Sequence, residues 1–245
     1  MATDPWRRVS AVPELGAAEV HVWLDELSVA APWATGDLLS LAEQEQAARM
    51  SAVARRAVFV RGRSALRFLA GHYLGVAPGD VPVRILDLGK PVLDSVAGRP
   101  SLAVSVAHSG DLIAIAFAYA SNIGVDIEGE DPSVDRGAIA RRFFSKAEAA
   151  AIAALPESAE HEAFFALWVR KEALLKAAGD GLSVPLAEVE LEVSRDAEPR
   201  LIRLPTEFGP VADWSVRGIS PGAGMAGAVA VRGPVTYVSC VRLTF

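Results

Sequence analysis

Two acidic side chains alternate with apolar ones in a short segment. Asp126 and Glu128 are interleaved with Val125 and Ile127, directly after Gly124. Successive side chains of a β-strand point to opposite faces, so both carboxylates would share one face while the valine and isoleucine enter the core. Neighbouring carboxylates repel each other and are stabilised by a cation or by strong hydrogen bonds. The pattern indicates either a cation site or a strand end with two solvated acids.

A second segment brings a tryptophan, a carboxylate and a lysine onto one stripe of a predicted helix. Trp168, Glu172 and Lys176 are four residues apart, so they lie on the same side of the helix. The stripe is either a surface Glu–Lys pair beside a core tryptophan or the wall of a cleft. If Glu172 joins Asp126 and Glu128, the three acids form an all-oxygen site of the kind that Mg²⁺ prefers. Lys176, one turn further on, would then meet a phosphate, as in phosphoryl transfer.

The composition excludes several other classes of protein. The chain has 245 residues, of which 51% are hydrophobic and 22% charged, enough to form a core and too apolar for global disorder. A formal net charge of -6 argues against general nucleic-acid binding. One cysteine and four scattered histidines exclude a disulfide framework and a zinc cluster. No apolar run reaches the roughly 18 residues of a membrane span, and no signal peptide is evident, so we expect a cytoplasmic protein.

Hydrophobic periodicity predicts alternating groups of strands and helices. Expected strands cover residues 20–24, 81–86, 102–107, 112–119 and 123–128. Expected helices cover residues 38–74, 136–144, 146–155 and 162–178, the first of them broken near Ser51 or Gly62. A turn is expected at residues 108–110, and residues 188–245 are expected to be mostly strand.

Part of this order occurs twice along the chain. A shift of 109 residues places residues 59–61 on 168–170 and Arg67 on Lys176. A looser match sets residues 21–25 against 124–128. If the repeat is a duplication, the chain consists of two similar α/β halves joined near residues 118–122. Ligand sites often lie between such halves.

Five segments, taken in order, resemble the motifs of the Sfp-type 4'-phosphopantetheinyl transferases. They are Gly89-Lys90-Pro91, His108-Ser109-Gly110, residues 124–128 (Gly-Val-Asp-Ile-Glu), residues 142–148 (Arg-Phe-Phe-Ser-Lys-Ala-Glu) and residues 168–176 (Trp-Val-Arg-Lys-Glu-Ala-Leu-Leu-Lys). Residues 179–186 (Gly-Asp-Gly-Leu-Ser-Val-Pro-Leu) resemble the segment that follows the last motif. Each motif is weak alone, but five in order from about residue 56 to 186 are specific. The shorter holo-acyl-carrier-protein synthase type fits less well, because this chain has both halves.

The resemblance implies an α/β (α+β) fold that is a pseudo-dimer of two similar α/β halves. Each half would have a mainly antiparallel sheet and a long helix, with the active site between the halves. Residues 1–120 would supply the coenzyme A nucleotide contacts. Residues 121–245 would supply the metal and catalytic residues and the contact with the carrier protein. We expect a monomer with internal pseudo-twofold symmetry.

The resemblance also implies the reaction. Such enzymes move 4'-phosphopantetheine from coenzyme A to a serine of an apo-carrier protein and release adenosine 3',5'-bisphosphate. Asp126, Glu128 and Glu172 would hold Mg²⁺ or Mn²⁺, and Asp126, Glu172 and Lys176 are the expected catalytic residues. Glu172 would help to remove the serine proton, and Lys176 would bind the pyrophosphate and neutralise the charge on the leaving phosphate.

Binding of the nucleotide end of coenzyme A is assigned to basic and loop residues. The expected set is Arg56, Arg63, Lys90, Pro91, His108 and Lys176. Ala107 departs from a serine that is common in the family, so a phosphate contact is lost or is replaced by Ser109 or a backbone amide. Glu148 matches a motif position, and the other explanation for it is an acid at a helix start.

A basic segment follows the acidic strand. Arg136, Arg141, Arg142 and Lys146 surround Phe143 and Phe144. Such a surface suits the acidic helix of a carrier protein, whether a polyketide, nonribosomal-peptide or fatty-acid carrier. Alternatively, both phenylalanines belong to the core and the arginines are simply solvated.

Two other functions are compatible with the residues. One is a non-catalytic relative that binds coenzyme A or a carrier protein, which would not need all four charged groups. The other is a Mg²⁺-dependent hydrolase of nucleotides or coenzyme A, which would need a positioned water and no protein acceptor.

Overall fold

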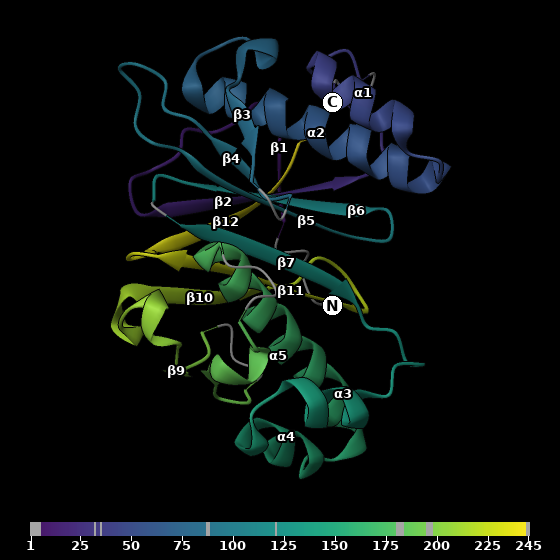
Figure 1. The fold of residues 1–245 in the computed structure, drawn as a ribbon, viewed down its shortest axis with the longest axis vertical. Coiled ribbons are helices and arrows are strands. Elements are labelled where there is room, and N and C mark those ends of the chain that lie inside the picture. The colour runs from purple at the N-terminus through teal and green to yellow at the C-terminus, as the bar shows by residue number, and fades with distance from the viewer. Residues whose placement is uncertain are drawn as a thin grey trace. The chain divides into compact units, whose positions relative to one another are not determined.

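The chain forms two compact units of mixed α/β structure in a computed structural model (Figure 1). The structure describes residues 6–31, 33–34, 36–86, 89–120, 122–179, 184–194 and 198–243. Unit 1 is Met1–Tyr119 together with Tyr237–Phe245, and unit 2 is Ala120–Thr236. The last strand therefore belongs to unit 1 and not to a C-terminal half of residues 121–245. Within the described residues, no helix has the length and apolarity needed to cross a membrane.

Unit 1 has a five-stranded sheet in the order β1-β12-β2-β6-β5, with α2 across one face (Figure 1). Strand β12 runs parallel to β1 and β2, whereas β2, β6 and β5 are antiparallel. The elements are β1 (Arg7–Val9), β2 (Glu19–Glu26), α1 (Leu41–Arg49), α2 (Val53–Leu74), β3 (Val83–Ile85), β4 (Pro91–Leu93), β5 (Ala103–Ser109), β6 (Leu112–Ala118) and β12 (Tyr237–Leu243).

The predicted helix over residues 38–74 is interrupted at residues 50–52, near Ser51 and not at Gly62. Gly62 is buried inside α2, where it faces the side chain of Ile113 on β6. The predicted hairpin is confirmed, but His108 and Ser109 belong to strand β5. Gly110 and the following residue form the turn, and Gly110 has a left-handed φ of 56°.

Unit 2 has a three-stranded antiparallel sheet in the order β10-β11-β7, with α5 packed on β7 and β11 (Figure 1). Its elements are β7 (Ile123–Gly129), α3 (Arg136–Phe143), α4 (Lys146–Ala153), α5 (Glu157–Ala178), β8 (Glu190–Leu191), β9 (Leu201–Arg203), β10 (Trp214–Ile219) and β11 (Met225–Arg232). The residues after 188 are less regular than predicted, because 3₁₀ turns at 206–208 and 211–213 interrupt the strands.

Each unit contains a strand, a short helix, a 22-residue helix, a short hairpin and two longer strands in that order. The long helices correspond at a displacement of 104 residues, from Val53 to Glu157 at their starts. Each is followed by a glycine in the left-handed region, Gly75 or Gly179. The shift of 109 residues is therefore wrong, because apolar helices match one another at several registers. That the units form a pseudo-dimer stays a prediction.

Candidate active site

Strand β7 is buried on both of its faces. Val125 and Ile127 are fully buried in the core, and Asp126 is only 5% exposed. Glu128, near the end of the strand, is half-buried. The alternative of two solvated acids is therefore wrong for Asp126, whose carboxylate lies inside the protein and needs a compensating positive charge.

Helix α5 lies against the carboxylate face of β7. Gly124 makes this possible, because a Cβ at that position would overlap the carbonyl oxygen of Ala173 and lie 2.5 Å from the Ala177 nitrogen. The close approach brings Nζ of Lys176 within 2.6 Å of Oδ1 of Asp126. Lys176 therefore pairs with the acid on the strand, and the predicted surface pair between Glu172 and Lys176 is not the arrangement found.

Glu172 shares this negative environment. Burial raises the pKa of Glu172 above its usual value, and the charges of Asp126 and Glu128 raise it further, while Lys176 opposes the effect. The structure thus brings the four predicted residues close enough for their charges to interact. A buried carboxyl with a raised pKa next to a specific charge partner is a common feature of functional sites.

The donor chemistry of this carboxylate cluster suits a hard divalent cation. All three side chains offer oxygen, and the repulsion that raises the pKa of Glu172 is the kind that Mg²⁺ relieves. Within the described parts of the chain, no three acidic, histidine or cysteine side chains converge closely enough to form a complete metal site. Lys176 provides the positive charge beside Asp126 in this structure. The metal ligands remain a prediction.

A cavity of about 640 Å³ lies in unit 1, between the start of α2 and the β5–β6 hairpin. Its lining includes Arg63, Pro91 and His108 from the predicted set. It also includes Arg55 but not the neighbouring Arg56, and both side chains are exposed on α2. The apolar part of the lining comes from Met50, Ala54, Val58, Phe59, Val106 and Ile113. A cavity of this size with a few cations suits an anionic ligand that has an apolar part.

Arg63 is the most constrained cation of this cavity. Its Nη1 is buried and has no hydrogen-bond partner among the described residues, and its guanidinium lies 5.6 Å from the ring of Phe59. Burial lowers its pKa below the usual value, and Arg67 adds to this, while Glu43 opposes it. A buried guanidinium nitrogen without an acceptor favours a bound anion.

Arg55 was not predicted from the sequence, because several arginines are crowded along this helix. Its spacing was the available signal, since Arg55, Phe59 and Arg63 are four residues apart and share one stripe of α2. Ala107 is buried and lies on the strand face opposite Val106 and His108, which line the cavity. The missing hydroxyl at position 107 therefore does not affect this cavity. Lys90 is half-buried beside Pro91.

Glu148 has a structural role that its motif did not disclose. It forms a capping box with Ser145 at the start of α4 and also accepts a hydrogen bond from the Leu191 nitrogen at 3.0 Å. Its two carboxylate oxygens lie 2.8 and 2.6 Å from Nζ of Lys171, which is fully buried. Glu148 is therefore an acid at a helix start, as the alternative explanation had it, and it is also one half of a buried ion pair.

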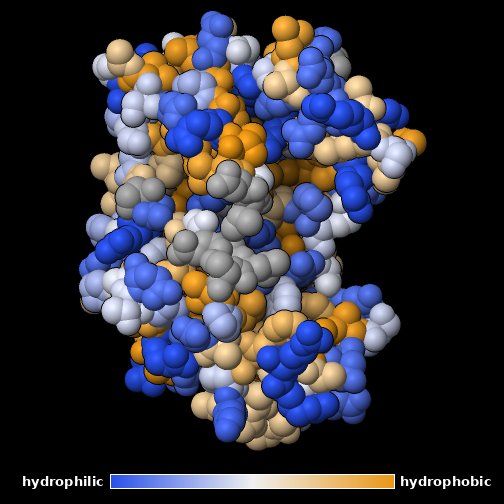
Figure 2. All heavy atoms as spheres, viewed as in Figure 1, coloured by the Kyte–Doolittle hydropathy of each residue, from blue (hydrophilic) through white to orange (hydrophobic). Residues whose placement is uncertain are grey.

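The basic segment is exposed at the end of unit 2 that α3 and α4 form. Arg141, Arg142 and Lys146 are exposed, and Figure 2 shows strongly hydrophilic side chains over these helices. The guanidinium of Arg142 lies 5.0 Å from the ring of the partly buried Phe143. Phe144 is only 4% exposed and packs among other aromatic rings. The core alternative is thus correct for Phe144, and Phe143 is partly buried against the same core.

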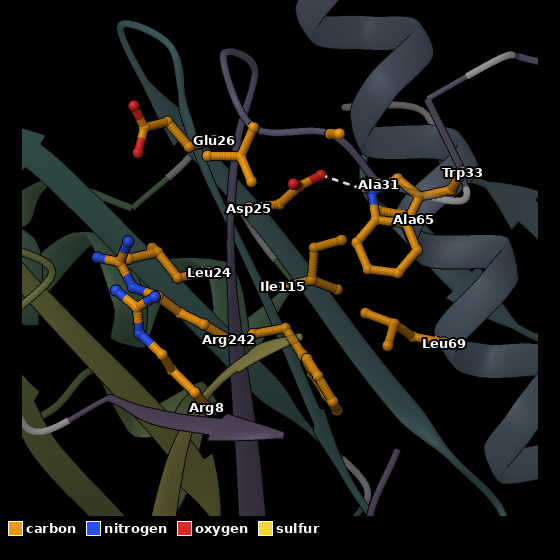
Figure 3. Close-up of a pocket in the computed structure, with 13 residues that line it drawn as sticks. Arg8, Leu24, Asp25, Glu26, Ala31, Trp33, Ala65, Leu69, Ile115 and Arg242 are labelled. Carbon is orange, nitrogen blue, oxygen red and sulfur yellow. Dashed lines mark hydrogen bonds between the residues drawn. The ribbon is translucent and has the colours of Figure 1, made fainter. Parts of the chain in front are cut away.

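Strand β2 of unit 1 carries an acid, Asp25. It corresponds to Glu128 when residues 21–25 are set against residues 124–128. Arg61 binds both carboxylate oxygens of Asp25 at 2.6 Å. Nε1 of Trp33 donates to Oδ2 at 2.7 Å (Figure 3). Beside it lies a cavity of about 100 Å³, with Arg8 and Arg242 on the side opposite Trp33 (Figure 3). Asp25 is therefore neutralised by the protein itself.

A model of the 4'-phosphopantetheinyl transferase superfamily matches residues 122–225, which include the carboxylate cluster. The 4'-phosphopantetheinyl transferase HetI of Nostoc sp. is 33% identical over 88% of each chain. Sfp of Bacillus subtilis is 33% identical over 54% of this chain and 55% of its own. Psf-1 of Bacillus pumilus is 38% identical over about half of each chain. The chain therefore belongs to the 4'-phosphopantetheinyl transferase family, whose members transfer the phosphopantetheine group of coenzyme A to carrier proteins.

Proposed function

We propose that Asp126, Glu128 and Glu172 hold a Mg²⁺ ion, with Mn²⁺ as a possible substitute, on the pyrophosphate of coenzyme A. The observation that carries this proposal is the gathering of carboxylates from β7 and α5: burial raises the pKa of Glu172, and the charges of Asp126 and Glu128 raise it further. When bound, the metal supplies positive charge to the phosphate oxygens. The protein's own part is to carry the three acids on two packed elements, β7 and α5, close enough for their charges to interact.

The reaction transfers a phosphoryl-linked group between two oxygens. The Oγ of the carrier serine forms a bond to the β-phosphorus of coenzyme A, and the bond from that phosphorus to the bridging oxygen breaks. Adenosine 3',5'-bisphosphate leaves with the bond electrons. We assign the removal of the serine proton to Glu172, whose carboxylate lies close enough to Asp126 and Glu128 for their charges to interact.

Lys176 has a second task in this proposal. Its side chain is 33% exposed and lies beside Asp126, so its ammonium group can also reach a ligand in solvent. We assign it to the leaving phosphate, where a fixed positive charge stabilises the charge that develops as the bond breaks.

The cavity of unit 1 is assigned to the nucleotide end of coenzyme A. Its apolar lining suits the adenine ring, and Arg63, with the buried Nη1, suits a phosphate. Arg55 and His108 line the same cavity and add polar contacts. Arg56, Lys90 and Lys176 stay in the predicted set, although they are not among the residues that line the cavity.

The exposed basic surface of α3 and α4 is assigned to the carrier protein. The chain has a net charge of -6, so an acidic carrier would be repelled unless a local basic surface attracted it. Arg141, Arg142 and Lys146 are exposed on these two helices.

Incubation with coenzyme A, Mg²⁺ and an apo-carrier protein separates the proposed function from its alternatives. A gain of carrier mass together with nucleotide release identifies the transferase. Nucleotide release without a mass gain would identify the hydrolase, and neither product would identify a binding protein. A panel of acyl, peptidyl and polyketide carriers in the same assay identifies the preferred partner.

A further inference from the structure

Unit 1 contains a buried ion pair between its short helix and its long helix. Ser40 and Glu43 form a capping box at the start of α1. Oε2 of Glu43 lies 2.7 Å from Nε of Arg67 on α2, and both side chains are almost completely buried. Nη1 of Arg67 also donates to the carbonyl oxygen of Val81 at 3.1 Å. The pair therefore ties α1, α2 and the chain after α2 to one another.

Unit 2 contains the same arrangement at corresponding places. Glu148 is again the third residue of a capped short helix, and Lys171 again lies on the 22-residue helix. Lys171 also donates to the carbonyl oxygen of Val189, which follows a 3₁₀ turn as Val81 does. We call the Glu43–Arg67 pair the first anchor and the Glu148–Lys171 pair the second anchor.

The second anchor satisfies every donor of a buried ammonium group. Lys171 has three N–H donors, and its acceptors are the two oxygens of Glu148 and the carbonyl of Val189. Rotation or sliding of α5 would break all three bonds and leave a charge buried without a partner. The pair therefore fixes the rotation of α5 about its axis, which apolar packing without directional bonds would fix less well.

Each anchor lies next to residues that the proposed function uses. Arg67 follows Arg63 by one helical turn, and the charges of Glu43 and Arg67 both act on Arg63. Lys171 directly precedes Glu172 and lies five residues before Lys176. Because the backbone of a helix is rigid over such distances, an anchor that fixes the helix also fixes the positions of these side chains.

We propose that the two anchors are positioning devices with separate tasks. The first anchor holds Arg63 in the unit 1 cavity and so sets the affinity for coenzyme A. The second anchor holds Glu172 and Lys176 beside Asp126 and so sets the rate of transfer and the dependence on Mg²⁺. This division of tasks rests on the proposed function of the two sites.

The test compares two matched double variants, Glu43→Gln/Arg67→Met and Glu148→Gln/Lys171→Met. Each replaces a buried ion pair without leaving an unpaired charge, and glutamine can still complete the capping box. Three quantities are measured well below the unfolding temperatures. They are the Kd of coenzyme A by calorimetry without a carrier protein, the kcat at saturating coenzyme A, and the Mg²⁺ concentration that gives half of the maximal rate.

The first double variant is expected to raise the Kd of coenzyme A about tenfold and to leave kcat and the Mg²⁺ requirement near wild type. The second is expected to lower kcat by about tenfold to a hundredfold, since a reacting group moved by about 1 Å loses that much rate. It should also raise the Mg²⁺ requirement, and it should change the Kd of coenzyme A much less than the first double variant does. If either double variant fails to fold, Arg67→Lys or Lys171→Arg takes its place, because each keeps the charge and changes the hydrogen-bond geometry.

The proposal is overturned if both variants change the same constants by similar factors, or if both only lower the unfolding temperature. A separate Glu172→Gln variant distinguishes this failure from failure of the proposed site. If Glu172→Gln is inactive and the two double variants change the same constants, only the division of tasks between the anchors is rejected, and the proposed site stands. A Glu172→Gln variant with wild-type turnover removes Glu172 from the site and thereby rejects the task of the second anchor.

Discussion

Glu172 is expected to destabilise the folded protein, although the proposed reaction needs it. Its pKa is raised by burial and by the acids near it, so its charged form is disfavoured in the folded protein. The folded state therefore binds the proton more tightly than the unfolded state does. As the pH rises from the pKa of Glu172 in the unfolded protein through its pKa in the folded protein, ionisation of this side chain lowers the free energy of unfolding.

The variant Glu172→Gln should unfold at a higher temperature than the wild type in buffer with a chelator, while losing transfer activity. The gain should be larger at pH 7.5 than at pH 4.5, because the wild-type side chain is largely protonated at the lower pH. Thermal unfolding at the two pH values checks this. A Glu172→Gln variant that unfolds at a lower temperature than the wild type at pH 7.5 would show that the charged carboxylate does not destabilise the folded protein.

Lys176 is expected to act mainly on the rate. Lys176→Ala should lower kcat by an amount that corresponds to about 3 to 4 kcal/mol, the usual loss for one preorganised electrostatic group. The KM for coenzyme A should change less, because the contact strengthens as charge develops on the leaving phosphate. Steady-state kinetics over a range of coenzyme A concentrations measure both constants. A higher KM with a normal kcat would contradict the assigned role.

At the scale of residues, the sequence predicted the acids and the lysine because strand and helix periodicity place them on defined faces. Lys171 and Arg55 were missed for different reasons. The partner of Lys171, Glu148, is 23 positions away, and only the tertiary fold brings the two together. Arg55 lies in a run of arginines, where composition does not indicate which side chain faces the cavity.

The contact between β7 and α5 is the element-scale feature on which the carboxylate cluster depends. Gly124→Ala should destabilise the protein by about 1 to 3 kcal/mol or more, the usual cost of forcing an extra group into packed space. The new Cβ would overlap backbone atoms of α5, which cannot move out of the way as a flexible side chain could. Urea unfolding monitored by tryptophan fluorescence measures the change.

Gly62 provides the matched control for this prediction. A Cβ at Gly62 would come no closer than 3.7 Å to Ile113, an ordinary contact, and alanine favours the interior of a helix over glycine. Gly62→Ala should therefore stabilise the protein by about 0.5 to 1 kcal/mol. Equal effects of the two substitutions would mean that Gly124 does not set the spacing of α5 and β7.

Most elements up to residue 178 were predictable, because their apolar residues recur with a clear helical or strand period. Residues 190–203 were harder, because β8 and β9 have only two and three residues and show no measurable period. The position of the break between α1 and α2 also escaped a unique prediction. Ser51 and Gly62 are both residues at which a helix can be interrupted, and the structure shows Gly62 buried within α2. Most of the motif at residues 179–186 lies outside the described residues.

At the scale of the whole molecule, the acidic net charge makes the basic surface on α3 and α4 a testable docking site. Arg141→Glu should raise the KM for the carrier protein and leave the KM for coenzyme A almost unchanged. The effect should weaken between 0.1 M and 1 M salt, as the Debye length falls from about 10 Å to about 3 Å. Kinetics at the two salt concentrations test this.

Arg200→Glu is a control with the same change of net charge. Arg200 is 74% exposed in unit 2 and lies outside α3 and α4. If Arg200→Glu and Arg141→Glu raise the carrier KM equally, the net charge of the protein and not a docking surface is responsible. If neither changes it, the carrier docks elsewhere.

The assignment of a Mg²⁺ ion to the carboxylate cluster is tested most directly by one measurement. The rate at which an apo-carrier protein gains the mass of phosphopantetheine is followed as a function of Mg²⁺ concentration for the wild type, Asp126→Asn and Glu128→Gln. We predict a saturable Mg²⁺ dependence for the wild type. Both variants should show no transfer at the concentration that saturates it, while they remain folded. Wild-type rates with an unchanged Mg²⁺ dependence in both variants would contradict the assignment of these acids to the metal.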